Sequence, residues 1–184
     1  MVEVRELRLA GVYEIIPPRL GDHRGFFSET YSAQKLADKG IDLAFVQDNH
    51  SLSGSAGVLR GLHYQLPPYA QDKLVRVVRG AIFDVAVDIR RSSPTFGSWL
   101  GLVVSAESWN QLLVPKGFAH GFVTLVPDTE VVYKVTDRYA PDCERSIRFD
   151  DPAIGIGWPI PADRVTLSDK DKSAPLLAEA EVFE

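Results

Sequence analysis

The four histidines are the side chains of this sequence best suited to proton transfer, and their spacing limits the chemistry open to them. They are His23, His50, His63 and His120, and no two are two or four residues apart. A metal site made of two histidines and a carboxylate would therefore have to assemble from separate strands. His63 is suited to act as a base, because an imidazole with a pKa near ~6.5 is partly neutral at neutral pH.

The elements that must position these histidines are short strands, rich in β-branched and aromatic residues and separated by turn residues. The strands are predicted over residues 73–79, 81–88, 99–105, 111–115, 120–126 and 130–136. Strands at this spacing indicate an antiparallel sandwich or barrel. Helices are few: one is predicted over 32–39, with Ser32 as its N-cap and Gly40 just past its end, and a second is predicted to start at Ser168.

The segment before these strands departs from the strict alternation of side chains between the two faces of a strand. In residues 57–65, GVLRGLHYQ, a side-chain period of two places Arg60 and His63 on opposite faces. A β-bulge at Gly61 would bring both onto one face, because bulges re-aim side chains and glycine tolerates their backbone geometry. We therefore expect Arg60 and His63 to point the same way.

Composition narrows the class of protein. The chain has 184 residues, 45% hydrophobic and 24% charged, which predicts one folded domain over residues 1–184. With 20 basic and 25 acidic residues the net charge is −5, which argues against a nucleic-acid-binding protein. Cys143 is the only cysteine, and residues 92–106, the longest uncharged stretch near the middle, are too short and polar to cross a bilayer. We expect a cytoplasmic protein without membrane contact.

A short motif links His120 to a known fold. Residues 115–120, PKGFAH, have the P-x-G-x-x-H form of the second cupin motif. The first cupin motif would supply an H-x-H pair of metal ligands, but the corresponding strand carries His63-Tyr64-Gln65. The sequence therefore predicts a metal-free cupin barrel.

Ten blocks in order then resemble the dTDP-4-dehydrorhamnose 3,5-epimerase family, from about Gly11 to Leu177. The blocks are DHRGFFSE at 22–29, FVQDNHS at 45–51, VLRGLHYQ at 58–65, KLVR at 73–76, FDVAVD at 83–88, SPTFG at 93–97, GFAHGF at 117–122, YK at 133–134, DP at 151–152 and LSDKD at 167–171. The resemblance implies an all-β fold of the cupin type, a double-stranded β-helix or jelly-roll barrel with a few short helices.

The same resemblance implies a cofactor-free isomerase of dTDP-L-rhamnose biosynthesis. Such enzymes invert carbons 3 and 5 of dTDP-4-dehydro-6-deoxy-D-glucose, through an enolate of the 4-keto group, to give dTDP-4-dehydro-L-rhamnose. Inversion needs a base on one face and an acid on the other. In this sequence His63 matches the base, Asp171 its carboxylate partner and Tyr133 the acid, while Lys73 would support the enolate electrostatically.

Further positions match the family's binding residues for the nucleotide sugar. The residues expected at or near the diphosphate are Arg24, Arg60 and Lys170. The residues expected at the thymidine end are Phe27, Glu29, Gln47, Asn49 and Tyr139, of which Tyr139 would stack on the base. His120 and Glu144 also match binding positions. Arginine suits a diphosphate because its planar fork binds two oxygens at once. Because residues 24–49 precede the barrel strands, the resemblance also implies a homodimer in which N-terminal strands are exchanged.

The sequence departs from the family at two positions. Asp72 stands where a glycine is usual before Lys73, so it could redirect Lys73 or pair with it, and Ser28 stands where a third aromatic is common.

Alternative interpretations keep the fold and change the activity. They are a single-site epimerase or 3,4-ketoisomerase of a related dTDP-deoxysugar, a non-catalytic cupin that binds a nucleotide sugar, and a metal-dependent cupin oxygenase.

Overall fold

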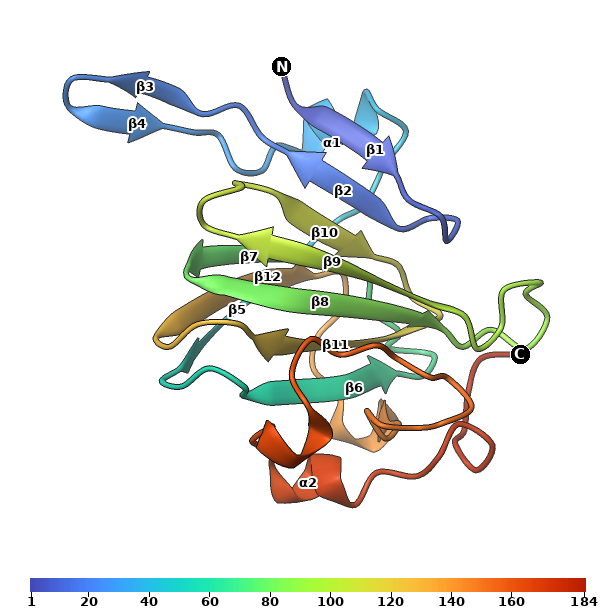
Figure 1. Ribbon diagram of the computed structural model, residues 1–184. Coiled ribbons are helices and arrows are strands. Elements are labelled where there is room, and N and C mark those ends of the chain that lie inside the picture. The colour runs from blue at the N-terminus through green and yellow to red at the C-terminus, as the bar shows by residue number, and fades with distance from the viewer.

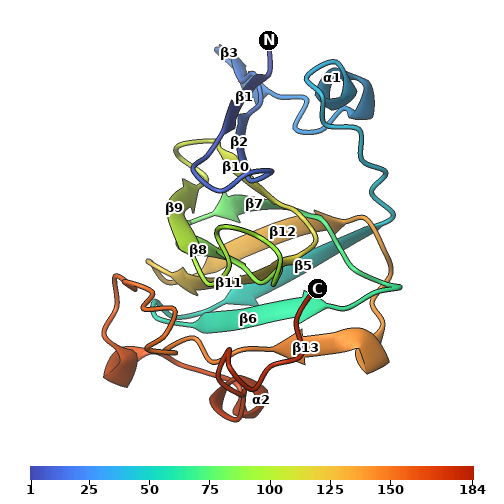
Figure 2. The same cartoon turned by 90° about the vertical axis from the view of Figure 1, so that its right-hand side faces the viewer.

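Two antiparallel sheets face each other in a computed structural model that describes residues 1–184 (Figures 1 and 2). The six-stranded sheet runs in the order β1 (Glu3–Glu6), β2 (Tyr13–Ile16), β10 (Gln111–Val114), β7 (Lys73–Arg79), β12 (Thr129–Val135), β5 (Gln47–Ser53). The five-stranded sheet runs in the order β13 (Glu144–Ser146), β6 (Leu59–Gln65), β11 (Phe118–Thr124), β8 (Ala81–Asp88), β9 (Trp99–Ser105). The predicted antiparallel all-β architecture is confirmed.

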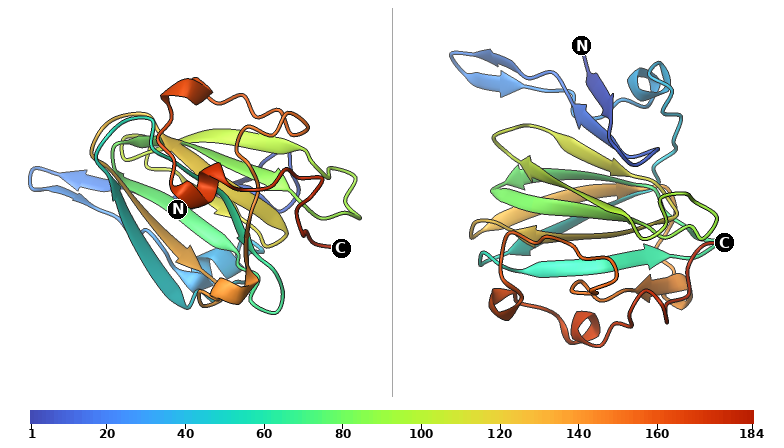
Figure 3. Two further views of the ribbon diagram at one scale, coloured as in Figure 1. Left: turned by 90° about the horizontal axis from the view of Figure 1, so that it is seen from below. Right: turned by 45° about the vertical axis from the view of Figure 1, so that its right-hand side comes forward.

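Both faces of the five-stranded sheet are covered, which explains why β8 is a nearly continuous apolar run rather than an alternating one. Ile82 and Ala86 of β8 join the core between the sheets. Val85 and Val87 point the other way and pack against the C-terminal segment, which contributes Leu177 among others. Figure 3 shows this segment following the outside of the barrel below β6.

The helices are few and short, as predicted, and each α-helix has its expected N-cap. They are α1 (Ala33–Ala37) and α2 (Asp169–Lys172), with 3-10 turns η1 (Pro141–Cys143) and η2 (Ala162–Arg164). The Oγ of Ser32 accepts the N–H of Lys35 at 3.4 Å, and that of Ser168 accepts the N–H of Asp171 at 3.2 Å. None of these helices has the length and apolar character needed to cross a membrane.

The bulge predicted at Gly61 is present. His63 of β6 lies opposite His120 of β11, and Arg60 lies opposite Phe122, so three steps on β6 match two on β11. Gly61 has a φ of +129°, and a Cβ built on it would lie 2.5 Å from the Cα of Gly121. The extra residue therefore needs glycine both for its backbone angle and for the close approach of β11.

Several strands differ from the sequence expectation: β10 ends one residue earlier than predicted, β12 is shifted by one residue, and β13 and the strands that precede β6 were not predicted. β11 starts at Phe118 rather than at His120, because Phe118 is buried in the core and pairs with Asp88 of β8. The expectation that residues 24–49 all precede the barrel is wrong for their last part. Gln47 begins β5, which pairs with β12 along its whole length, although its sequence is mostly polar.

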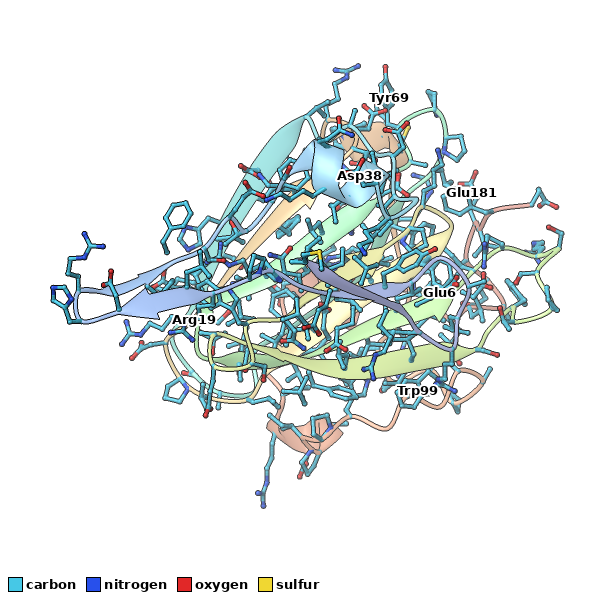
Figure 4. The ribbon with its side chains drawn as sticks, turned by 90° about the horizontal axis from the view of Figure 1, so that it is seen from above. Glu6, Arg19, Asp38, Tyr69, Trp99 and Glu181 are labelled. Carbon is cyan, nitrogen blue, oxygen red and sulfur yellow. The ribbon has the colours of Figure 1, made fainter.

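A hairpin of β3 (Leu20–Asp22) and β4 (Gly25–Phe27) projects away from the barrel (Figure 1). Both of its strands are solvent-exposed along their length, with Phe27 at 70% of full exposure. At its base the guanidinium of Arg19 lies 4.2 Å from the ring centroid of Phe26 and 4.7 Å from that of Trp109. Figure 4 places Arg19 where this arm leaves the barrel. The contacts of Arg19 with both rings fix the base of the arm to the barrel.

Candidate active site

A cavity of about 400 Å³ is lined by both sheets and by the chain that leads into α2. Its lining residues include Arg60 and His63 of β6, Lys73 of β7, His120 and Phe122 of β11, Tyr133 of β12, and Ser168 and Asp171. Arg60 and His63 share this cavity because of the Gly61 bulge. The structure thus brings together all four candidate catalytic residues, which come from positions 63 to 171 of the sequence.

His63 is held by Asp171. The Nε2 of His63 lies 2.5 Å from the Oδ1 of Asp171, whose side chain is only 4% exposed. Burial raises the pKa of Asp171, but hydrogen bonds from His63, Ser168 and the backbone of Gly61 outweigh it and bring the pKa below its usual value. An ionised carboxylate can only accept, so Nε2 carries the proton. The other ring nitrogen, Nδ1, is then the one able to take a proton.

Tyr133 belongs to the wall opposite His63, since β12 lies in the six-stranded sheet and β6 in the five-stranded one. Burial raises the pKa of Tyr133, Arg60 lowers it and Glu144 raises it, and the pKa ends above its usual value. The phenol therefore keeps its proton at neutral pH. The cavity has a group that can accept a proton on one wall and a group that can donate one on the other.

Lys73 lies beside Tyr133 in the same sheet, because its strand neighbour is Val135 of β12. Its Nζ donates to the backbone oxygen of His63 at 3.3 Å. Burial lowers the pKa of Lys73 to about 8, although the carboxylates of Asp84 and Glu144 raise it. Lys73 is thus still mostly protonated at neutral pH and brings positive charge to the space between base and acid.

A second histidine–carboxylate pair includes His120, which lines the same cavity. The Nε2 of His120 lies 2.6 Å from the Oδ1 of Asp84, and both side chains are buried. Sequence reasoning selected His120 but gave Asp84 no role. The signal was available, since Asp84 alternates with Ile82 and Ala86, which face the core, and so places a charge at an inward position of a buried strand.

A smaller cavity of about 130 Å³ shares His63, Lys73 and Tyr133 with the larger one. It is lined in addition by polar residues predicted to bind the nucleotide: Gln47, Asn49, Tyr139 and Glu144. Glu144 accepts from the hydroxyl of Tyr139 at 2.8 Å and from Lys170 at 2.5 Å. Five predicted binding residues therefore form one polar cluster next to the candidate catalytic residues.

Four predicted binding residues line neither cavity: Lys170, which is bonded to Glu144 of the polar cluster, and three residues of the N-terminal segment. Arg24 and Phe27 are on the exposed hairpin, where Arg24 pairs with Asp22 at 2.5 Å. Glu29 follows the hairpin and pairs with Lys35 of α1 at 2.7 Å. Within one chain these three residues of the N-terminal segment do not reach the site.

Asp72 neither redirects Lys73 through its backbone nor pairs with it. The φ of Asp72 is not positive, so its backbone is not in the conformation that favours glycine. Its carboxylate is held by two other groups. Oδ1 accepts from the backbone N–H of Lys116 at 3.1 Å, and Oδ2 accepts from the hydroxyl of Thr136 at 2.9 Å. Asp72 therefore ties the start of β7 to the neighbouring chain segments and leaves Lys73 free to face the cavity.

Comparison with known proteins identifies the family. A family model described as dTDP-4-dehydrorhamnose 3,5-epimerase matches residues 6–179. A protein of that name from Sinorhizobium fredii is 51% identical over 178 residues, covering 97% of this chain and 91% of the relative.

Two solved structures are similar throughout. A dTDP-4-dehydrorhamnose 3,5-epimerase from Bacillus anthracis, with TDP and PPi bound, has a TM-score of 0.92 at 47% identity and covers 96% of this chain and 99% of its own. A dTDP-6-deoxy-D-glucose-3,5-epimerase from Legionella pneumophila, in complex with dTDP-4-keto-L-rhamnose, has a TM-score of 0.92 at 46% identity, with coverages of 97% and 94%.

Proposed function

This chain belongs to the dTDP-4-dehydrorhamnose 3,5-epimerase family, a family of isomerases, and from that membership we propose the reaction that it catalyses. It converts dTDP-4-dehydro-6-deoxy-D-glucose to dTDP-4-dehydro-L-rhamnose, within dTDP-L-rhamnose biosynthesis, by inverting carbons 3 and 5. The observation that carries the proposal is the cavity with the His63–Asp171 pair on one wall and Tyr133 on the other. Epimerisation needs a base and an acid on opposite faces of one carbon.

In the proposed mechanism His63 removes the proton from a carbon next to the 4-keto group. The C–H electron pair moves into the ring to form the enolate, and Nδ1 of His63 receives the proton. Asp171, on Nε2, stabilises the imidazolium that results. The positive charge of Lys73 stabilises the enolate oxygen. Tyr133 then donates its proton to the opposite face of the carbon, and exchange with solvent restores both residues before the second carbon reacts.

This chemistry calls for no cofactor, because the chain itself supplies the base, the acid and the positive charge. Both carbons flank the keto group, so the enolate delocalises the charge that each deprotonation creates. We therefore propose that activity is independent of added metal or nucleotide cofactor. Full activity after dialysis against a chelator supports this, and loss of activity that Zn²⁺ or Fe²⁺ restores would refute it.

For the nucleotide part of the substrate we propose the polar cluster and Arg60. Tyr139 is exposed and bonded through its hydroxyl to Glu144, which leaves a ring face for the thymine. Gln47 and Asn49 are joined by a hydrogen bond of 2.9 Å and offer amide groups to the nucleoside. Arg60 makes only long hydrogen bonds, of 3.3 and 3.4 Å, to Leu52 and Ser53, so its guanidinium can bind the diphosphate.

We further propose a homodimer in which the β3–β4 arm completes the site of the second copy. Arg24, Phe27 and Glu29 match substrate-binding positions yet lie outside the cavities of their own chain. Mixing two inactive variants tests this. Arg24→Ala and His63→Ala, unfolded and refolded together, should regain about a quarter of the wild-type activity, because a mixed dimer holds one site with neither change. Recovery no greater than the sum of the separate variants would refute the exchange.

The proposed reaction is tested by proton NMR of dTDP-4-dehydro-6-deoxyglucose with the protein in D2O. We expect deuterium to enter carbons 3 and 5 and the signals of the L-rhamnose configuration to appear. Exchange and inversion at one carbon alone would instead support a single-site epimerase. Binding without exchange would support the non-catalytic alternative and refute the proposal.

A further inference from the structure

One carboxylate beside the candidate site has an unsatisfied oxygen. Asp84 lies on β8 with none of its surface exposed. Its Oδ1 is bonded to His120, but its Oδ2 is buried without any hydrogen-bond partner. Leaving a buried charged oxygen unpaired is unfavourable, so such an atom in a folded protein calls for a nearby compensating charge.

Lys73, on the opposite sheet, is a cation placed to supply that charge. Asp84 alternates on β8 with Ile82 and Ala86, which face the core between the sheets, and Lys73 lines the cavity from β7 in the opposite sheet. Lys73 makes no salt bridge, and its single hydrogen bond goes to the backbone of His63. Among the carboxylates that raise the pKa of Lys73 against its burial, Asp84 has the largest effect.

We propose that Asp84 is a positioning residue for this site, an inference that rests on the proposed epimerase function. Its Oδ1 fixes the orientation and tautomer of the His120 ring, and the negative charge of its carboxylate keeps Lys73 protonated at neutral pH. Asp84 touches no substrate atom in this scheme and acts through the two residues that do. The two histidines thus receive separate carboxylates, Asp171 for His63 and Asp84 for His120.

The effect of Asp84 must be separated from those of the other charges near Lys73. The titratable and charged groups that line its cavities or act on its charge are Arg60, His63 and Tyr64 on β6, Asp84 on β8, His120 on β11, Tyr133 on β12, Tyr139 after β12, Glu144 on β13, and Lys170 and Asp171 on α2. Glu144 has its own cation in Lys170, at 2.5 Å. Asp84 has no bonded cation other than the His120 ring, so it is the counter-charge most available to Lys73.

The test compares Asp84→Asn with Asp88→Asn. Both residues are fully buried carboxylates on β8, but Asp88 is the last residue of the strand and is bonded to Arg90, Ser93 and Thr95. The charge of Lys73 is read directly, without activity, from the pH dependence of its acetylation, measured by mass spectrometry between pH 6 and 10. We expect the Lys73 midpoint, near pH 8 in the wild type, to fall by about 1–2 pH units in Asp84→Asn. It should not move in Asp88→Asn.

Activity supplies the second readout. In Asp84→Asn the alkaline limb of the pH profile of kcat should move to lower pH by the same amount as the Lys73 midpoint, while the affinity for dTDP stays within a few-fold of the wild type. A uniform loss of activity with an unmoved limb would mean a merely structural role and would overturn the inference, as would an unchanged Lys73 midpoint. If the wild type catalyses no epimerisation, the proposed function fails, but the acetylation result still decides whether the charge of Asp84 raises the pKa of Lys73.

Should Asp84→Asn not fold, the reciprocal variant tests the same pair. Lys73→Met leaves the buried Asp84 carboxylate without its counter-charge, which raises the pKa of that carboxyl above its unfolded value. Stability is then gained as the pH falls, so the loss of Tm relative to the wild type should be smaller at pH 5.5 than at pH 8. A Tm difference that is the same at both pH values would overturn the inference.

Discussion

Replacing Asp171 with asparagine should disable His63 while leaving the fold in place. The variant keeps the volume of the side chain and loses its charge. The hydrogen bond at 2.5 Å between a buried carboxylate and an imidazole is charge-assisted and contributes about 1.5–3 kcal/mol, or roughly 10- to 150-fold in rate once the imidazolium forms. The amide of asparagine can also donate to Nε2, which would move the ring proton to Nδ1 and block the base. We therefore expect kcat to fall by about 10²–10⁴.

The assay is deuterium exchange at carbons 3 and 5, followed by NMR, with ¹⁵N shifts of His63 to report its tautomer. Asp169→Asn is the matched control, because Asp169 lies in the same short helix with its side chain fully exposed and pairs only with Lys172. It should retain wild-type exchange. A fall of less than tenfold in Asp171→Asn, with the Nε2–H tautomer retained, would refute the role given to Asp171.

The remaining predictions address the base, the diphosphate and the stability of the barrel. His63→Ala should reduce exchange at both carbons by about 10²–10⁴ with dTDP affinity within a few-fold, and substantial residual exchange would reveal another base. At 100 times its Kd, dTDP should raise the Tm by about 5–10 °C, and Arg60→Ala should reduce that shift; a wild-type Tm that ignores dTDP would count against the nucleotide site. Burial raises the pKa of Asp88, but hydrogen bonds from Arg90, Ser93 and Thr95 bring it to about 2. Because this pKa is lower in the folded than in the unfolded state, ionised Asp88 stabilises the fold above pH ~4. About 2 kcal/mol of the free energy of unfolding should be lost as the pH falls toward 2. Asp88→Asn should be less stable at pH 7 and show a smaller acid loss in chemical denaturation, and an unchanged acid loss would contradict this.

Local patterns predicted the strands and caps that bury apolar residues. The strands over 73–79, 81–88 and 99–105 have the predicted bounds, because their β-branched residues fill both faces of the sheets. Ser32 and Ser168 cap the two helices as expected, since an N-cap depends only on its own turn. The Gly61 bulge was also predictable, because the spacing of Arg60 and His63 breaks the period of two.

Elements stabilised by long-range pairing were not evident from the sequence. β5 is a polar edge strand whose identity comes from its pairing with β12, and β1 is mostly exposed and paired only with β2. The alternation in β8 indicates that Asp84 faces inward, but not that His120 is its partner. Asp84 is 36 residues away in sequence and meets His120 only through the pairing of β8 with β11.

The central claim is that His63 removes a proton from one face and Tyr133 returns one to the other. Tyr133→Phe keeps the ring and removes only the hydroxyl, so the enolate should still form and His63 should return the proton to the face it came from. Proton NMR in D2O measures both outcomes on one sample. We predict deuterium incorporation with retained configuration, and inverted product reduced by about 10²–10⁴. Inversion near the wild-type rate, or loss of exchange together with inversion, would contradict the assignment of the two faces.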